Sequence, residues 1–453
     1  MNNNPPGNSE LKAGLGIAAP LALAALVNMG ISITDVVMMG WLGHVVLAAG
    51  AAVSDYYSII FYLSAGVIAA LSPLISAARG SNNIDGIGPL VINAFWIALL
   101  LSVMGVVLVI LAPLVLHFIG AEEALVVEAR RYAPMMAITY VNLLFVRVWH
   151  QFFAAHEHSE VIFHATIVIL PLNALGNYIF MFGKMGLPAM GITGIGLSSV
   201  LTTGLMLIWL TVVALRNTDY KKYWLSIGWR PEKKVFLKMF RLGAPIGLSS
   251  LGEMGIYLFS TVIIATFGSA ALAAHTIAIR LGGLLFAVPL GLSQAMTVRT
   301  GLAFGAGNAD QLQQVIQAHK KMGAAWLITI IFVLWFLVFP CIEWLVAKDS
   351  AGSEYIGILG TLFILTLFMQ PIDYVLTVLA GYLRGVQDTK VPMQMILFGY
   401  WLVGFPIGLW LAYHFDYAAI GIWLGLLIGV ITSCLLLIYR FYSTSEKVTH
   451  RFK

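Results

Sequence analysis

Charged side chains are scarce in this sequence. Asp, Glu, Lys and Arg make up 10% of its 453 residues, and hydrophobic residues make up 60%, whereas a soluble globular domain has about 25% charged residues. Cysteine is scarcer still. The two cysteines, Cys341 and Cys434, both lie in apolar segments, so they indicate neither an extracellular disulfide framework nor a zinc site. The composition therefore predicts a polytopic membrane protein.

Motifs for catalysis and for ATP hydrolysis are also missing. The chain has no P-loop lysine motif, no nucleophile elbow and no HExxH, so we expect neither direct ATP drive nor a membrane enzyme. "HEHSE" (156–160) falls in a short turn between two predicted helices, where a solvated loop is expected rather than a metal site. "GITGIG" (191–196) is not a phosphate loop, because it opens a predicted helix whose small residues permit close packing. We expect no cofactor other than a coupling ion.

Apolar runs of about 20 or more residues predict twelve membrane-spanning helices. They lie near 13–41, 47–78, 87–118, 130–155, 160–183, 189–215, 238–267, 271–304, 321–346, 354–383, 391–414 and 418–442. The first run is too long for the apolar region of a signal peptide, so no cleaved leader is expected. An even number of spans places both termini on one side of the membrane.

Lysine and arginine are distributed unevenly between the two predicted sides. The termini and even-numbered loops hold 19 of the 25 Lys and Arg residues, the odd-numbered loops hold 4, and Arg147 and Arg280 fall inside predicted helices. The positive-inside rule therefore predicts that both termini are cytoplasmic. It also accounts for the net charge of +5 without a nucleic-acid partner. The expected organisation has two lobes, at 13–215 and 238–442. A basic cytoplasmic loop joins them at 216–237, and cytoplasmic tails lie at 1–12 and 443–453.

An internal repeat relates the two halves of the chain. Segment 19–49 aligns with segment 244–274 when position 19 is placed on position 244. This shift between equivalent positions is called the repeat offset below. Of these 31 positions 12 are identical, including the words Ala-Pro and Met-Gly-Ile. Because each half has an even number of helices, the halves are expected to be parallel repeats with a site at mid-membrane between them. The sequence thus predicts an all-α polytopic membrane protein with twelve transmembrane helices in two parallel-repeat six-helix lobes around a central cavity.

Acidic residues inside the apolar segments are the candidate functional residues, because an ionised carboxylate in hydrocarbon is costly. At about 1.5 Å per helical residue, Glu253 and Asp373 lie at similar depth, and Asp35 lies in the outer half. Asn173 and Asn177 share one face of the fifth predicted helix and can supply amides near Asp35. A fourth acid, Asp55, falls near the outer end of the second predicted helix, where we expect a solvated or capping role.

Buried carboxyl groups of this kind can exchange a proton or, when kept ionised, hold a cation. Na⁺ would need several oxygens, and Pro371 leaves the carbonyl of Leu367 without its helical donor, so Na⁺ at Glu253 and Asp373 is one expectation. Arg147 and Arg280 are expected either to be counter-ions that lock helices together or to contact substrate; Arg280 aligns with Asp55 in the repeat. The remaining predictions are cavity residues Tyr257, Met369 and Gln370, and helix kinks at Pro20, Pro245 and Pro371.

Five segments of the sequence resemble the multidrug and toxic compound extrusion (MATE) family, in its NorM-like bacterial branch. They are "AAPLALAALVNMGISITDVVMMGWLG", "PLNALGNYIFMFGKMGLPAMGITGIG", "APIGLSSLGEMG", "AAHTIAIRLGGLLFAVPLGLSQAMTVRTGLAFG" and "QPIDYVLTVLAGYLRGVQD". The resemblance implies a twelve-helix antiporter of the bacterial cytoplasmic (inner) membrane, expected to be monomeric, that expels drugs and toxic organic cations in exchange for inward Na⁺ or H⁺.

The resemblance also implies which residues couple the cation. They are the acids Asp35, Glu253 and Asp373 and the asparagines Asn173 and Asn177. The chain departs from the family pattern at two positions. Met369 stands where some relatives carry a tyrosine, and Arg280 stands where relatives have a neutral residue.

Two functions are compatible with these features. The leading hypothesis is antiport by rocker-switch alternating access, and the alternative is a flippase for a lipid-linked sugar or similar amphiphile, whose anionic headgroup would suit Arg147 and Arg280. A channel is disfavoured, because a pore needs no duplicated rocking lobes. The coupling ion is expected to be either Na⁺ or H⁺, bound in either lobe.

Overall fold

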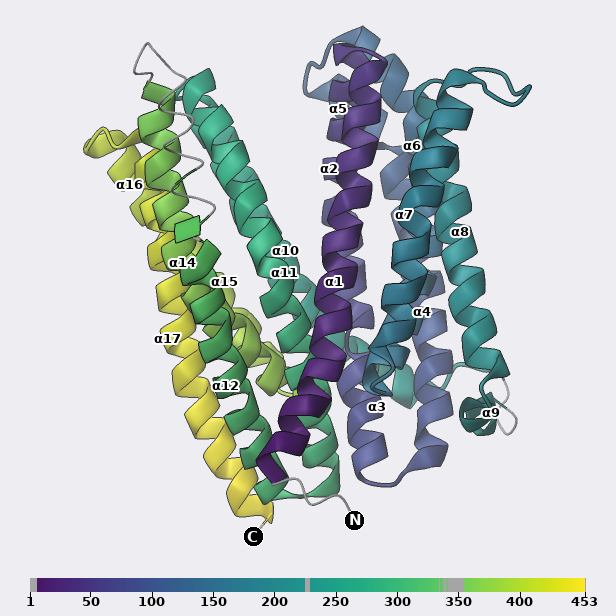
Figure 1. Cartoon of the computed structure of the whole chain (residues 1–453), viewed down its shortest axis with the longest axis vertical. Coiled ribbons are helices and arrows are strands. Elements are labelled where there is room, and N and C mark those ends of the chain that lie inside the picture. Colours follow the sequence, from purple (N-terminus) through teal and green to yellow (C-terminus); the bar gives the residue numbers. More distant parts are fainter. Residues whose placement is uncertain (1–5, 225–228, 334, 337–339, 341–353, 453) are drawn as a thin grey trace. The chain divides into compact units, whose positions relative to one another are not determined.

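The structure is a computed structural model that describes residues 6–224, 229–333, 335–336, 340 and 354–452. The described chain is helical, and Figure 1 labels its elements. Cys341 and the C-terminal end of the predicted span 321–346 lie outside the described residues. The elements are α1 (Pro6–Trp41), α2 (His44–Ile68), α3 (Leu71–Gly80), η1 (Ile84–Gly86), α4 (Ile87–Ile110), α5 (Ala112–Phe118), α6 (Glu123–Ala155), α7 (Ser159–Phe182), α8 (Ile192–Arg216), α9 (Thr218–Trp224), α10 (Lys233–Ala265), α11 (Ser269–Ala306), α12 (Ala309–Val333), α14 (Glu354–Gly385), α15 (Lys390–Leu397), η3 (Phe398–Gly404), α16 (Phe405–His414) and α17 (Ala418–Phe452).

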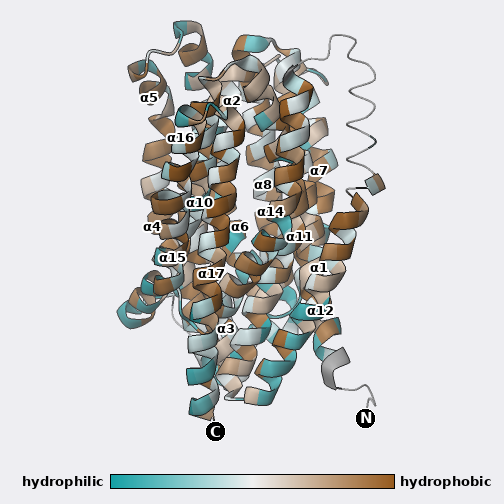
Figure 2. Cartoon of the chain, turned by 90° about the vertical axis from the view of Figure 1, so that its left-hand side faces the viewer, coloured by the Kyte–Doolittle hydropathy of each residue, from teal (hydrophilic) through white to brown (hydrophobic). Residues whose placement is uncertain are grey.

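Most of these helices are long and apolar enough to cross a membrane. Ten segments meet that condition within the described ranges, and several join consecutive elements such as α2 with α3 and α4 with α5. The two other long helices, α6 and α12, are not among the ten, yet each contains one of the predicted spans or its beginning. Figure 2 shows the hydrophobic residues along α4 and the more hydrophilic C-terminal end of α17. The predicted all-α membrane fold is confirmed.

The repeat is visible in the local backbone as well as in the sequence. Helix α2 starts at His44 and α11 starts at Ser269, two positions that the repeat offset aligns. The residue before each start is a glycine with positive φ, 115° at Gly43 and 109° at Gly268. Side chains rarely adopt such φ values, so glycine is the residue that lets the chain turn between the long helices at both places.

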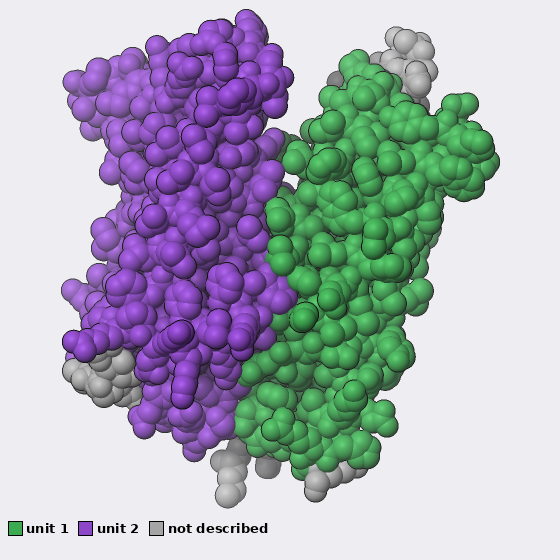
Figure 3. Space-filling view, turned by 180° about the vertical axis from the view of Figure 1, so that it is seen from behind, with its two compact units in different colours: residues 1–22, 248–453 green, residues 23–247 purple. Residues whose placement is uncertain are grey.

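The chain divides into two compact units, shown in Figure 3. Unit 1 comprises residues 1–22 and 248–453, and unit 2 comprises residues 23–247. The two divisions fall inside α1 and α10, at positions that the repeat offset also aligns. Pro20 and Pro245 lie inside these continuous helices, shortly before each division. The first helix of each repeat therefore begins in one unit and ends in the other.

Glycines let the beginning of each crossing helix pack closely on a neighbour. In unit 2, a Cβ added to Gly66 of α2 would lie 2.3 Å from the Cα atom of Gly247 in α10. In unit 1, a Cβ added to Gly291 of α11 would lie 2.4 Å from the carbonyl oxygen of Ala18 in α1. Gly66 and Gly291 are aligned by the repeat offset, so both repeats use the same position for a backbone-to-backbone contact.

Candidate functional site

A carboxylate and two amides meet inside unit 2. Asp35 of α1 is half-buried and accepts a hydrogen bond of 2.6 Å from the Nδ2 atom of Asn177 in α7. The same Nδ2 atom lies 3.3 Å from the Oδ1 atom of Asn173, one turn earlier in α7. Both asparagines are buried. The structure therefore brings together the three residues that the sequence pattern grouped.

Helix α8 fixes the position of the α7 asparagines. Ser198 of α8 donates a hydrogen bond of 3.0 Å to the backbone carbonyl of Asn173. This close approach depends on small residues: a Cβ at Gly176 would lie 2.5 Å from the Ser198 hydroxyl oxygen, and one at Gly194 would lie 2.6 Å from the carbonyl carbon of Phe180. The predicted packing role of the small residues in 191–196 is thus confirmed.

The cluster around Asp35 offers oxygen atoms of the kind that hold a proton or a hard cation. The Oδ1 atom of Asn177 is buried and has no hydrogen-bond partner in the described part of the chain. Tyr132 of α6 lies near both Asp35 and Ser54. Carboxylate, amide and hydroxyl oxygens are hard ligands, which suit alkali and alkaline-earth cations better than transition metals.

A second acidic cluster lies inside unit 1. Asp373 of α14 is buried, Glu253 of α10 is half-buried, and the two carboxyl groups are close enough to repel each other when both are ionised. Tyr257, one turn after Glu253, interacts electrostatically with both acids. Arg384 of α14 also lies near Glu253, and its guanidinium donates a hydrogen bond of 2.7 Å to Ser293 of α11.

The other predicted site residues differ in burial, and some lie apart from the two acidic clusters. Met369 and Gln370 are buried in α14, and they precede Pro371 within the same helix. The Oε1 atom of Gln370 has no hydrogen-bond partner among the described residues. Arg147 of α6 is half-buried, and within the described ranges its Nε atom is likewise unbonded. Arg280 of α11 is exposed. In the part of the chain that the structure describes, neither arginine joins the acidic clusters.

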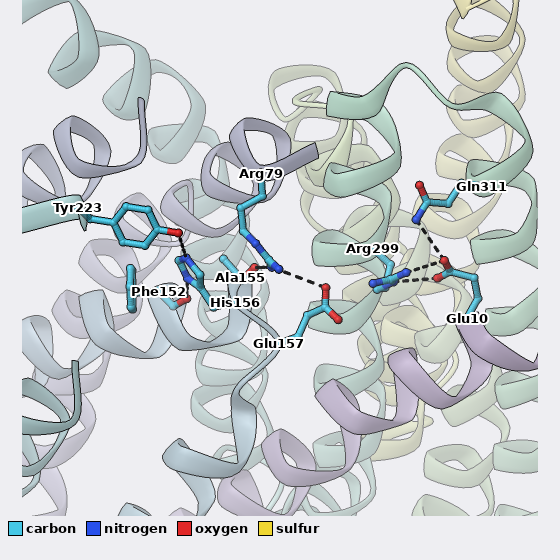
Figure 4. Close-up of polar contacts among 9 residues, drawn as sticks. All are labelled: Glu10, Arg79, Phe152, Ala155, His156, Glu157, Tyr223, Arg299 and Gln311. Carbon is cyan, nitrogen blue, oxygen red and sulfur yellow. Dashed lines mark hydrogen bonds and ion pairs between the residues drawn. The ribbon is translucent and has the colours of Figure 1, made fainter. Parts of the chain in front are cut away.

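Polar contacts also occur at the ends of several helices (Figure 4). In unit 2, Arg79 of α3 donates to the carbonyl of Ala155 and lies 3.6 Å from the carboxylate of Glu157. His156, predicted to be in a solvated turn, is instead buried, and its ring nitrogens lie 2.8 Å from the Phe152 carbonyl and 3.3 Å from the Tyr223 hydroxyl. Burial raises the pKa of Tyr223, so its hydroxyl keeps its proton and can donate to His156.

Unit 1 has a corresponding contact at the beginning of α1. The carboxylate of Glu10 is bound by two nitrogens of Arg299 in α11, at 2.8 Å and 2.5 Å, and by Gln311 of α12 at 3.2 Å. Figure 4 shows all three side chains converging. The side chains of Glu10 and Arg299 are only 7% and 12% exposed. Residues 6–12, predicted as part of a tail, are therefore helical as the beginning of α1, and Glu10 is packed within unit 1.

The model of the MatE family matches residues 20–179 and 245–410 of this chain. The chain belongs to the MatE family. The two matched segments start at positions that the repeat offset aligns, so they cover the same point in each repeat. Proteins of this family are transporters rather than enzymes, which agrees with the missing catalytic motifs.

Curated relatives and solved structures agree with this family assignment. A "Probable multidrug resistance protein NorM" of Mesorhizobium japonicum is 33% identical over 438 residues, 95% of this chain and 93% of that protein. A protein of the same name from Brucella suis is 30% identical, over 93% of this chain and 90% of that protein. The MATE transporter VcmN of Vibrio cholerae, in its bent form, has the same fold, with a TM-score of 0.84 and 19% identity over 99% of this chain and 100% of that one.

Three residues beside the acids of this MatE protein are absent from the sequence predictions. Tyr132 lies near Asp35, and Arg384 and Tyr400 act on the unit 1 acids. Tyr400 is buried in the π-helical segment η3, an irregularity that is frequent at functional sites. Residues 398–404 have the composition of an ordinary apolar run, so no sequence signal marks this irregularity.

Proposed function

We propose that this MatE protein is a secondary active efflux transporter that exports organic compounds, mainly cations, in exchange for inward Na⁺ or H⁺. The observation that carries the proposal is the presence of carboxyl clusters inside apolar helices of both units. One is Asp35 with its asparagines, and the other is Glu253 with Asp373. The names of the relatives, which describe multidrug resistance, support export as the direction of transport.

Neutralisation of Asp35 is the step through which unit 2 would respond to an ion. The bond from Asn177 to an ionised Asp35 is charge-assisted, and it links α7 to α1. A proton on Asp35, or a cation bound to it, weakens this bond and makes the free Oδ1 atom of Asn177 a ligand or acceptor. The bound ion would then favour the conformation in which α1 and α7 are no longer joined by the charge-assisted bond.

Repulsion between Glu253 and Asp373 provides the corresponding response in unit 1. Two nearby carboxylates in a buried site repel each other when both are ionised, and Arg384 acts on Glu253 as a partial counter-charge. A proton or Na⁺ supplied from outside removes the repulsion, and the side chains of Tyr257 and Tyr400 border the same place. If Na⁺ is the coupling ion and binds in unit 1, Glu253 and Asp373 would supply its ligands.

Alternating access is the mechanism that we propose for coupling these clusters to export. The ion would bind from the outside, shift the conformational equilibrium and allow drug to leave outward, and the drug would bind again from the cytoplasm. We propose that the protein works as a monomer in the bacterial cytoplasmic membrane with both termini in the cytoplasm, as the distribution of Lys and Arg favours.

Dye transport in proteoliposomes tests the proposal. Purified protein should move a cationic dye under an imposed pH gradient or an imposed Na⁺ gradient, and the gradient that drives transport identifies the ion. Asp373→Asn should abolish gradient-driven transport while leaving the protein folded. No dye movement under either gradient would reject the antiport function, and wild-type transport by Asp373→Asn would remove this residue from the coupling site. Asp85→Asn, an exposed acid in η1, is the matched control.

A further inference from the structure

The indole of Trp401 in η3 is bonded to the backbone of α10 beside one of the unit 1 acids. Its Nε1 atom donates a hydrogen bond of 3.1 Å to the carbonyl oxygen of Gly252, the residue directly before Glu253. A carbonyl oxygen has two lone pairs, so Gly252 can accept this bond in addition to its bond within the helix. The indole therefore ties η3 to α10 at the turn that carries Glu253.

Glycines on α10 make room for this contact. Positions 252, 255 and 259 share one face of the helix, and a Cβ added at Gly255 would lie 3.1 Å from the Cζ2 atom of the Trp401 ring. A Cβ added at Gly252 would overlap the side chain of Leu397, the last residue of α15. Phe259 packs edge-on against the Trp401 ring, with ring centroids 5.4 Å apart. The indole thus lies on a face of α10 where two of these three positions carry no side chain.

The π turn of η3 lets the same stretch of chain pack against α17. Gly399 and Gly404 both contact α17, although they are five residues apart. A Cβ at Gly404 would lie 2.7 Å from the carbonyl oxygen of Gly425, and one at Gly399 would overlap the hydroxyl of Ser433. Residues five apart do not share a face of an α-helix, whereas the i to i+5 pairing of a π turn brings them onto one face. Because both glycines are fixed on α17, the π turn sets the direction in which Trp401, between them, faces α10.

Glu253 depends on such support, because its carboxyl group is not held by side-chain hydrogen bonds. In the part of the chain that the structure describes, the carboxylate accepts no hydrogen bond, and its neighbours act on it through charge. Asp373 repels an ionised Glu253, and Arg384 attracts it. Both effects vary with distance, so the free energy of a charge on Glu253 depends on where the backbone of α10 is held.

We propose that Trp401 is a positioning residue that sets the separation of the Glu253 and Asp373 carboxyl groups. It acts through the backbone of α10 and not as a ligand of the ion. A coupling ion, Na⁺ or H⁺, relieves the repulsion between these groups, and the repulsion depends on their separation. The indole bond therefore adjusts the affinity for the ion. The proposal rests on the proposed transport function and adds to it a residue that controls ion affinity in unit 1.

Substitution Trp401→Phe tests this role, because it keeps an aromatic ring beside Gly255 and removes the N–H donor. In proteoliposomes, under the gradient that drives dye transport, the half-saturating concentration of Na⁺ or H⁺ should change about threefold to tenfold, the effect of losing one neutral hydrogen bond. Transport at a saturating concentration of the ion should remain close to that of the wild type. Trp423→Phe is the matched control, because Trp423 is buried in the same unit and its indole donates at 3.0 Å to His275 of α11. This control should lose similar stability and leave the ion affinity unchanged.

Infrared difference spectroscopy follows the protonation of Glu253 without transport. The carboxylic acid band that is lost in Glu253→Gln identifies this residue. The proton concentration at half the intensity of that band should change about threefold to tenfold in Trp401→Phe and stay constant in Trp423→Phe. An unchanged band in Trp401→Phe, or an equal change in both variants, would overturn the positioning role whatever the transport result.

Two further outcomes separate the possible failures. If the band responds as expected but neither gradient moves dye through the wild-type protein, the proposed transport function fails and the positioning role stands. Gly255→Ala is a second variant, because its Cβ would press on the Trp401 ring, and it decides the question if Trp401→Phe does not fold. It should change the same proton concentration, and a wild-type value in this variant would then reject the positioning role.

Discussion

The ion pair between Glu10 and Arg299 allows a sharp test of how the first turns of α1 are held. Both side chains are nearly buried, and two guanidinium nitrogens bind the carboxylate. Substitution Glu10→Gln keeps the shape of the side chain but removes the charge that the guanidinium faces. Breaking a buried ion pair from one side destabilises a protein by about 3–5 kcal/mol. Because both groups retain slight exposure, we expect a loss at the lower end of that range, about 3 kcal/mol.

Hydrogen exchange measured by mass spectrometry is the appropriate assay, because the pair anchors a local segment. A loss of about 3 kcal/mol corresponds to roughly a hundredfold rise in the local opening equilibrium. The amides of residues 6–22 should therefore exchange about a hundred times faster in Glu10→Gln, with little change in unit 2. Glu128→Gln is the matched control, because Glu128 pairs with Arg131 at 2.8 Å on the surface of α6, where an ion pair contributes about 0–1 kcal/mol.

A double-mutant cycle decides whether the ion pair itself is responsible. Arg299→Gln should be as damaging as Glu10→Gln, and the double variant should be clearly more stable than the sum of the two losses predicts. A coupling energy below about 0.5 kcal/mol, the range found for independent sites, would show that the two residues contribute separately and would refute the reasoning.

Two further predictions concern packing and the unit 2 site. Gly66→Ala should lower the free energy of unfolding by about 1–3 kcal/mol in a thermal unfolding assay, because the new Cβ meets the backbone of Gly247. Gly16→Ala is the control and should be neutral or stabilising, because a Cβ there meets nothing within 4 Å. Equal effects of the two substitutions would contradict the packing argument. Asn177→Leu should remove the donor to Asp35 and reduce ion-driven dye transport at least tenfold, and unchanged transport in proteoliposomes would exclude this bond from coupling.

The architecture and part of the site could be predicted because their signals are local. Apolar runs mark the helices, and the spacing of Asn173 and Asn177 places both amides on one face whatever lies opposite. The meeting of Asp35 with Asn177 then followed from two polar positions in otherwise apolar helices. Asp373 and Glu253 were predicted to lie at similar depth from the rise per helical residue, which allows them to meet but does not place them side by side.

The missed residues depend on contacts between distant segments, which the sequence pattern does not encode. Tyr132 and Tyr400 are aromatic residues in apolar runs, and such residues are equally typical of a core. Glu10 precedes the apolar run of α1 and therefore looked like part of a solvated tail, although Arg299, far along the chain, buries it. His156 was expected in a solvated turn because its burial depends on Tyr223, which belongs to a separate helix, α9.

The crossing of α1 and α10 between the units has a consequence for biosynthesis. When the ribosome has completed residues 23–224, unit 2 still lacks the segment that places Gly247 against Gly66, and residues 1–22 must wait for α11 before they can pack. Each half of the chain therefore lacks a segment of its own unit until the other half is present. Cutting the chain in the central loop should yield two fragments that must be made together. The same exchange suits an ancestor in which two identical six-helix chains swapped their N-terminal segments before they were fused.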